Sequence, residues 1–181
     1  MQRRLIFNSQ ILSVTIRRLC HQLIENHGSF DESVILGMQP RGIYLAKRIK
    51  ANLEEILNKE INLGYLDATF HRDDFRRRES PLKANATYIP FIIEDKKVIL
   101  VDDVLFTGRT VRAAMDAMIS FGRPKKVELL VLINRKYTRD LPIEPDYVGR
   151  NVNTIESQRV LVEWKEQNKP DDNIWLIEKA L

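Results

Sequence analysis

The feature that most constrains the fold is a run near the middle of the chain, Lys97-Val98-Ile99-Leu100-Val101, in which polar and apolar side chains do not alternate. A strand with one face in water would alternate, so this run predicts a strand that is covered on both faces. Strands of this kind are typical of a parallel sheet with helices on both sides. A second such run spans residues 127–133. The two runs together predict the α/β class.

Helical spacing fills the segments around these strands. Apolar residues recur every three or four positions between Asn8 and Gly28, after Gly42, and after Gly108, which predicts three helices. Shorter apolar runs predict strands at residues 33–37, 61–66, 146–149, 159–163 and 173–177. Strands that alternate with helices predict one domain over residues 1–181, with a mainly parallel central sheet flanked by helices. The polar stretch 67–90 is predicted to be the longest loop.

The composition excludes several classes of protein. No stretch approaches the roughly 20 apolar residues of a membrane span, and Met1-Gln2-Arg3-Arg4 leads into no apolar run of the signal-peptide kind. We therefore expect a cytoplasmic protein that does not enter a membrane. Cys20 is the only cysteine, so an internal disulfide is excluded. The net charge of +4 and the pI near 9.2 are compatible with an anionic partner.

The first two-sided strand leads directly into Asp102 and Asp103, and then into a turn that opens a helix. The turn comprises Leu105, Phe106, Thr107, Gly108, Arg109 and Thr110. A helix start carries free N–H groups and the positive end of the helix dipole, glycine lets the backbone approach an anion, and threonine adds a hydroxyl donor. Ionised Asp side chains only accept hydrogen bonds, and two neighbouring ones suit the cis hydroxyl groups of a ribose. The combination predicts a site for a phosphorylated sugar.

Other phosphate-binding motifs do not fit this turn. It lacks the GxxxxGK[ST] pattern of the Walker A loop and the GxGxxG pattern of dinucleotide folds. Taken alone, a pair of Asp residues often only ends a strand, and Thr107 could merely cap a helix. Because the strand, the carboxylates and the turn occur together in this order, a binding site is favoured over those structural interpretations.

The segment from Val98 to Gly122 resembles the phosphoribosyl pyrophosphate-binding motif of type I phosphoribosyltransferases. With Pro142-Ile143-Glu144-Pro145-Asp146-Tyr147-Val148-Gly149, it is similar to the branch of that family that combines uracil phosphoribosyltransferase activity with regulation of pyrimidine genes. The resemblance implies that the chain converts uracil and phosphoribosyl pyrophosphate to UMP and pyrophosphate. It also implies catalytic roles for Asp102 and Asp103, which would hold Mg²⁺ mainly through water, and assembly into at least a dimer.

The resemblance assigns two further loops. The run Gly37-Met38-Gln39-Pro40-Arg41-Gly42 lies between a predicted strand and a predicted helix, as the family's pyrophosphate loop does. Its residues Gln39, Pro40, Arg41 and Gly42 would hold the leaving group, although Pro40 removes one backbone donor and restricts Gln39. Residues 66–74 look like the entry to the family's flexible lid, from which Arg72 would reach the pyrophosphate on closure. A plain turn and a charged loop are the structural alternatives.

The sequence leaves the identity of the base open. The base would lie over residues 134–139, which do not distinguish uracil from a purine.

The second hypothesis is an RNA-binding regulator that senses UMP and binds the pyrimidine leader mRNA, with or without catalysis. Its candidate residues are Arg17, Arg18 and His21, at helical spacing, with Arg139 and Arg150 extending a positive face. Glu144 and Asn26 oppose it, because they stand where similar regulators carry arginines. The intact Asp pair and turn argue against an inactive homologue.

Overall fold

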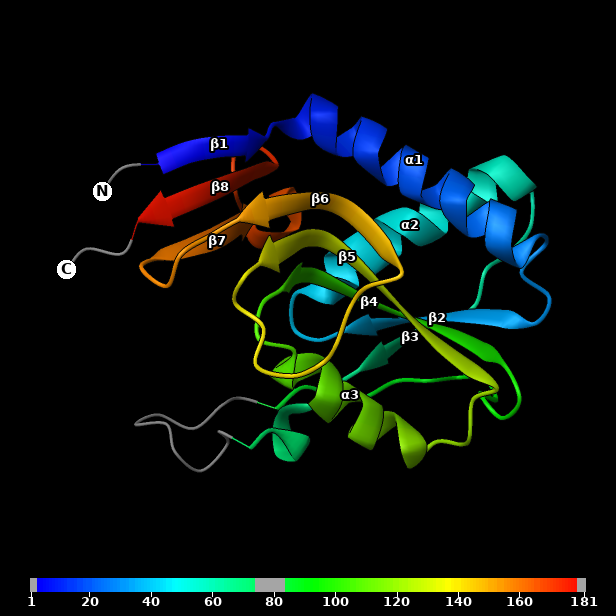
Figure 1. Cartoon of the computed structure of the whole chain (residues 1–181). Helices are drawn as coiled ribbons and strands as arrows, with labels where there is room; N and C mark the ends of the chain where they lie inside the picture. The colour runs from blue at the N-terminus through cyan, green and yellow to red at the C-terminus, as the bar shows by residue number, and fades with distance from the viewer. Residues whose placement is uncertain (1–2, 74–83, 179–181) are drawn as a thin grey trace.

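A five-stranded parallel sheet forms the centre of the computed structural model, which describes residues 3–73 and 84–178 (Figure 1). All four strand pairs of this sheet are parallel, as the two-sided apolar runs predicted. The strands, in spatial order, are β3 (Leu63–Leu66), β2 (Ser33–Met38), β4 (Lys97–Leu105), β5 (Lys126–Lys136) and β6 (Tyr147–Asn153). The predicted α/β fold is confirmed.

Helices cover both faces of this sheet. Figure 1 shows α1 (Ser9–His27) and α2 (Gly42–Leu57) on one face and α3 (Arg109–Ile119) on the other. The apolar side chains of the sheet accordingly divide between two clusters, one under α1 and α2 and one under α3. The Asn8 side chain caps α1 by accepting a hydrogen bond from the Ile11 N–H at 2.9 Å, and Gly28 ends the helix. No helix in the described part of the chain has both the length and the apolar character that a bilayer span requires.

A second, antiparallel sheet lies beside the first. It consists of β1 (Arg3–Phe7), β8 (Asn173–Glu178) and β7 (Gln158–Glu163) in that order. The sequence patterns predicted two of these strands but no second sheet, and they missed β1. Only two of the five β1 side chains are buried, so this strand carries no apolar period of its own.

An ion-pair cluster fastens this second sheet to α2. The Arg48 guanidinium of α2 forms ion pairs at 2.8 Å with Asp172 and with Glu166 of the 3-10 helix η2 (Lys165–Gln167). Its guanidinium carbon also lies 4.7 Å from the centre of the buried Trp164 ring. Because one cation contacts two carboxylates and an aromatic face, the two sheets are held in a defined relative position.

Two boundaries differ from the sequence prediction. Strand β4 continues to Leu105, so Asp102 and Asp103 lie within the strand and not after it. The predicted loop 67–90 contains the 3-10 helix η1 (Thr69–His71) and a bridge between Tyr65 and Tyr88. Residues 74–83 of the predicted lid, including Asp74, lie outside the described residues.

A buried polar network connects the end of α1 to the amino ends of β2 and β5. The aspartates lie at the opposite, carboxyl end of the parallel strands. His27 Nε2 lies 2.7 Å from Glu128 Oε2, and His27 Nδ1 lies 2.8 Å from the Ser33 hydroxyl. Tyr147 donates a hydrogen bond to the same Glu128 oxygen at 3.3 Å. Burial would raise the pKa of Glu128, but contacts with Lys126 and His27 lower it overall. The network therefore suits a neutral imidazole that donates to an ionised carboxylate.

Acid should weaken the fold through His27. Burial lowers the pKa of His27 from its usual 6.5, against the opposing pull of Glu128. Below pH 6.5 the unfolded chain therefore binds this proton more readily, and stability present above that pH is lost as the pH falls. We expect the free energy of unfolding, measured in urea, to fall by up to about 1.4 kcal/mol per pH unit in this window. His27→Gln should remove that slope, whereas His21→Gln, at an exposed position of α1, should retain it; equal slopes in both variants would contradict the assignment.

Candidate functional site

The carboxyl ends of β2 and β4 bring Arg41 and Asp103 together. Arg41 Nε lies 3.1 Å from Asp103 Oδ2. This approach requires Gly42, because a Cβ atom there would lie 2.4 Å from the Val101 carbonyl oxygen of β4. Arg41 also donates a hydrogen bond to the Val162 carbonyl of β7 at 2.7 Å. The basic residue of the predicted pyrophosphate loop thus bridges the aspartate pair and the second sheet.

The two aspartates form a pair of like charges, with Asp103 buried and Asp102 partly exposed. The Asp103 N–H donates to Asp102 Oδ1 at 2.8 Å. Burial raises the pKa of Asp102 well above its usual value, and the neighbouring Asp103 charge raises it further. Burial also raises the pKa of Asp103, while the charge of Arg41 opposes that shift. Within the described residues, neither Asp103 Oδ2 nor Arg41 Nε forms a hydrogen bond, so their 3.1 Å contact is an ion pair without hydrogen-bond geometry. The pair can therefore accept hydroxyl groups and favours additional positive charge nearby.

The predicted phosphate turn has the backbone of an anion site. Gly108 precedes α3 with φ of +91°, a left-handed conformation that favours glycine. A Cβ atom there would also lie 3.3 Å from the Ile143 side chain. No side chain caps the start of α3 through Gly108. Backbone N–H groups of the first helical turn can therefore meet a phosphate group.

The side chains of the turn divide between the core and the surface. Leu105 is buried under α3, while the Thr107 hydroxyl accepts a weak 3.4 Å hydrogen bond from the Arg109 N–H. The Arg109 side chain is turned away, toward Asp140 at 3.1 Å and toward Asp73. The Arg72 guanidinium donates to the Thr110 hydroxyl at 3.1 Å. The sequence-predicted lid arginine thus lies against the phosphate turn, and its contact with a pyrophosphate group stays a prediction.

The rest of the predicted pyrophosphate loop is held by the neighbouring segments. The Gln39 N–H donates to the Leu66 carbonyl at 2.9 Å, and its side-chain amide donates to the Ala86 carbonyl at 2.6 Å. The peptide bond between Gln39 and Pro40 is cis. The backbone N–H and one side-chain N–H of Gln39 are therefore used within the protein, and Arg41 is the charged residue of this loop.

Two arginines, Arg135 near the end of β5 and Arg139 just after it, contact the phosphate turn at one residue, Phe106. The Arg135 guanidinium carbon lies 3.8 Å from the centre of the Phe106 ring. Arg135 is only 5% exposed and donates to the Thr154 hydroxyl at 3.0 Å and to the Gln158 carbonyl at 2.9 Å. Arg139 donates to the Phe106 carbonyl and, at 2.6 Å, to Asn134 Oδ1. The segment expected to lie under the base is thus physically joined to the phosphate turn.

The sequence analysis did not identify the role of Arg135. It placed Arg135 only within the segment 134–139 under the base, whereas the position of Arg135 near the end of β5 buries its side chain. Burial lowers the pKa of its guanidinium from the usual value, and no carboxylate pairs with it among the described residues. The available signal was an arginine placed at the end of an otherwise two-sided apolar strand.

The residues proposed for an RNA face separate into two groups. Arg18 of α1 donates to the Gly149 carbonyl of β6 at 2.7 Å, and Arg150 of β6 donates to the Ile6 carbonyl at 3.0 Å. Arg17 and His21 are exposed on the same helix, where Arg17 pairs with Glu55 at 3.6 Å. Arg139 is not on this face, because it contacts Phe106 beside the start of α3. Across the described residues, neither Arg18 nor Arg150 forms an ion pair with a carboxylate.

A resident metal cluster is not apparent in this site. No group of three or more His, Cys, Asp or Glu side chains is placed to hold a metal ion in residues 3–73 and 84–178. Asp102 and Asp103 are two adjacent carboxylates with raised pKa values. They fit a hard cation such as Mg²⁺ that keeps several waters and shares its coordination with substrate phosphates.

Comparisons with known proteins agree with this geometry. Residues 5–167 match the model of the phosphoribosyl transferase domain family. The chain is 42% identical over 173 residues to the "Bifunctional protein PyrR" of Bacillus subtilis, covering 94% of both chains. It is 44% identical over 157 residues to the protein of the same name from Geobacter sulfurreducens, covering 87% and 88%. Hypoxanthine phosphoribosyltransferases of Trypanosoma cruzi (TM-score 0.73, 13% identity, 98% and 97% covered) and Staphylococcus aureus (0.70, 15%, 98% and 92%) share the fold.

The contact between Arg135 and Phe106 should be measurable as a coupling energy. We expect Phe106→Leu and Arg135→Lys each to lower the free energy of unfolding, and the double variant to lose less than the sum. The coupling should be about 0.5–2 kcal/mol, the range of cation–π contacts, as determined by urea denaturation of the four proteins. Phe121→Leu, at an exposed phenylalanine beyond the other end of α3, should show no coupling to Arg135→Lys. Strict additivity of Phe106→Leu and Arg135→Lys would disprove the stacking role.

Proposed function

Because this chain belongs to the phosphoribosyltransferase family, we propose that it transfers the phosphoribosyl group of phosphoribosyl pyrophosphate to uracil, forming UMP and pyrophosphate. The observation that carries this proposal is the succession along β4 and α3 of two adjacent carboxylates and a helix start preceded by a left-handed glycine. The helix start suits the 5-phosphate, and the carboxylates suit the ribose hydroxyl groups. A site that bound only a phosphate group would not need the two carboxylates.

In the proposed reaction, the protein forms no covalent bond to the substrate. A uracil ring nitrogen forms a bond to the anomeric carbon as the bond to the pyrophosphate oxygen breaks, and the nitrogen proton is released to solvent. Positive charge develops on the ribose ring. Asp102 and Asp103 would stabilise that charge, while the start of α3 and Thr110 hold the 5-phosphate in place. Arg41, 3.1 Å from Asp103, would stabilise the departing pyrophosphate.

Mg²⁺ fits the adjacent carboxylates of Asp102 and Asp103, because a hard cation prefers oxygen ligands. When bound with the substrate, the ion would neutralise charge on the pyrophosphate. Asp102 and Asp103 would hold it mainly through water. Arg72, already at Thr110, would help to exclude water from the site in this proposal.

Uracil is proposed as the base because the curated relatives at 42% and 44% identity carry the name PyrR. The structural neighbours named for hypoxanthine are 13% and 15% identical, so they support the fold and not a purine substrate. The test is a parallel assay of UMP, GMP, IMP and XMP formation from phosphoribosyl pyrophosphate with Mg²⁺. Formation of UMP alone is expected; activity with a purine and none with uracil would overturn the choice.

Substitutions in the site should separate binding from turnover. Thr110→Ala removes a hydroxyl donor to the 5-phosphate, so we expect KM for phosphoribosyl pyrophosphate to rise about tenfold. Asp103→Asn removes charge beside the developing cation and should lower kcat by about ten- to a hundredfold. Steady-state kinetics measure both effects. Ser120→Ala and Asp116→Asn, at the far end and outer face of α3, are the matched controls. Unchanged kinetics in Asp103→Asn would refute its role.

A second function, binding of pyrimidine leader mRNA in response to UMP, is favoured by Arg18 and Arg150. Backbone carbonyls hold both guanidinium groups in place, so their charges are fixed but not neutralised. A phosphate backbone is a natural partner for such charges. Glu144 remains unfavourable, although Lys136 lies 3.7 Å from it and offsets its charge.

A filter-binding titration against the organism's own pyrimidine leader RNA, with salt and UMP varied, tests this second function. Arg18→Gln should weaken binding and reduce the slope of log affinity against log salt by about one, since one phosphate contact is lost. Arg112→Gln on α3, on the opposite face of the sheet, should leave the slope unchanged. The function is excluded if the wild-type protein binds no RNA, or if both variants behave alike.

A further inference from the structure

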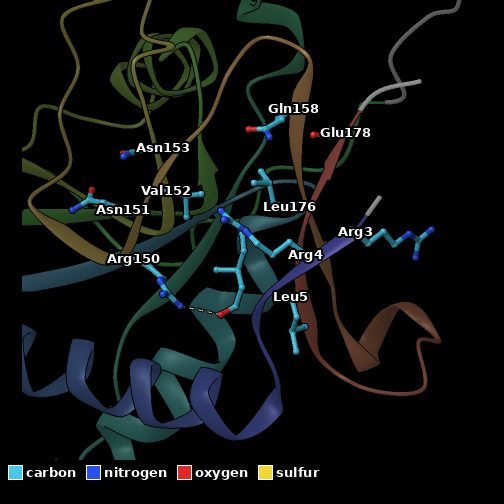
Figure 2. A pocket seen from close by; sticks show the side chains of 11 residues that line it. Arg3, Arg4, Leu5, Arg150, Asn151, Val152, Asn153, Gln158, Leu176 and Glu178 are labelled. Carbon is cyan, nitrogen blue, oxygen red and sulfur yellow. Dashed lines mark hydrogen bonds between the residues drawn. The ribbon is translucent and has the colours of Figure 1, made fainter. Parts of the chain in front are cut away.

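A cavity of about 1030 Å³ opens between the two sheets. Residues from β1, β6, β7 and β8 line it, and none of the Asp pair or phosphate-turn residues does. Figure 2 shows the Arg4 side chain pointing from β1 toward Val152 and Leu176, two buried apolar residues. The cavity is therefore separate from the transfer site and has an apolar floor beneath a charged entrance.

The charge of this cavity is mainly positive and is not neutralised. Arg3, Arg4 and Arg150 line it, against the single carboxylate of Glu178. In residues 3–73 and 84–178, none of these arginines forms an ion pair. Arg48 and Arg109, by contrast, each contact two carboxylates. Arg4 and Arg150 face this cavity without an internal counter-charge and so favour an anion, whereas the Arg3 side chain points away from it (Figure 2).

The remaining polar residues indicate what accompanies the anion. Asn151, Asn153 and Gln158 line the same cavity. The Asn151 Oδ1 accepts from the Asn134 side chain at 2.9 Å and the Gln158 Oε1 accepts from the Ile155 N–H at 3.3 Å, which leaves their NH₂ groups to donate to a ligand. Arg150 is held at the entrance by its hydrogen bond to the Ile6 carbonyl (Figure 2). A volume of this order is in the range of small-molecule sites, about 300–1,000 Å³. Charge, amides and an apolar floor together match a phosphorylated ligand that carries a sugar or a base.

We propose that this cavity is a second binding site of the protein, for a small phosphorylated ligand of nucleotide size. Arg4 and Arg150 bind the phosphate group, and the amides of Asn151, Asn153 and Gln158 bind the sugar or the base. This site is independent of the transfer reaction. One contact joins the two sites, because the Gln158 carbonyl accepts a hydrogen bond from Arg135; Arg135 variants would therefore disturb both and cannot serve as controls.

Nuclear magnetic resonance titration of the full chain tests the proposal, with ribose 5-phosphate and UMP as separate probes. The side-chain amide signals of Asn151 and Asn153 report on the cavity, and the Gly108 backbone N–H reports on the transfer site. Both sets of signals should shift in the wild-type protein. Arg4→Gln should weaken the cavity titration about tenfold or more, as for a lost charged hydrogen bond, and leave the Gly108 titration unchanged.

Two further variants and a titration with a single-stranded RNA octamer complete the test. Thr110→Val should weaken the Gly108 titration alone. Arg123→Gln removes an equal charge at an exposed site beyond α3, and should change neither titration. The proposal is overturned if the cavity amides do not shift while Gly108 saturates, if Arg4→Gln and Arg123→Gln act alike, or if only a single-stranded RNA octamer shifts the cavity amides. Loss of the Gly108 shifts alone would count against the transferase and not against this site.

Discussion

The rest of the site depends on two adjacent carboxylates at the end of the central strand, of which Asp103 is buried and Asp102 is partly exposed. Their ionised forms are unfavourable there, because burial raises the pKa of both carboxyl groups. The neighbouring residues offset this unfavourable free energy. Arg41 supplies a partial counter-charge, and Gly42 lets α2 start against β4. The start of α3 lies at the same carboxyl end of the sheet and offers backbone N–H groups there. A charged ligand would complete this balance.

The second sheet takes part in this arrangement. Arg41 donates to Val162 of β7, and Arg135 donates to Gln158 of the same strand. Arg48 then ties the segment after β7 to α2 through Glu166 and Asp172. The loops of the site thus follow strands of the parallel sheet, while carbonyl groups of the antiparallel sheet orient the arginines that contact these loops. Displacing β7 would disturb both the aspartate pair and Phe106.

The arginines of this protein serve two physical roles. Arg48 and Arg109 contact carboxylates and are neutralised within the fold. Arg18, Arg135 and Arg150 are held by carbonyl or hydroxyl oxygens, which orient a guanidinium without cancelling its charge. Net charge alone would not separate these roles, since both kinds contribute equally to the value of +4. Among these, Arg18 and Arg150 are exposed and available to phosphate, whereas Arg135 is buried.

The sequence by itself determined the parallel sheet, the three helices and the phosphate turn, because each depends on local pattern: unbroken apolar runs, helical spacing, and glycine at a left-handed position. It also predicted that Asp102, Asp103 and the turn lie together between a strand and a helix, although β4 continues through both aspartates to Leu105. Only the tertiary structure decided that β1 pairs with β8, that Arg135 stacks on Phe106 twenty-nine positions away, and that Arg139 belongs to the turn and not to α1. These contacts join residues distant in sequence, and their energy comes from burial and orientation, which no local pattern records.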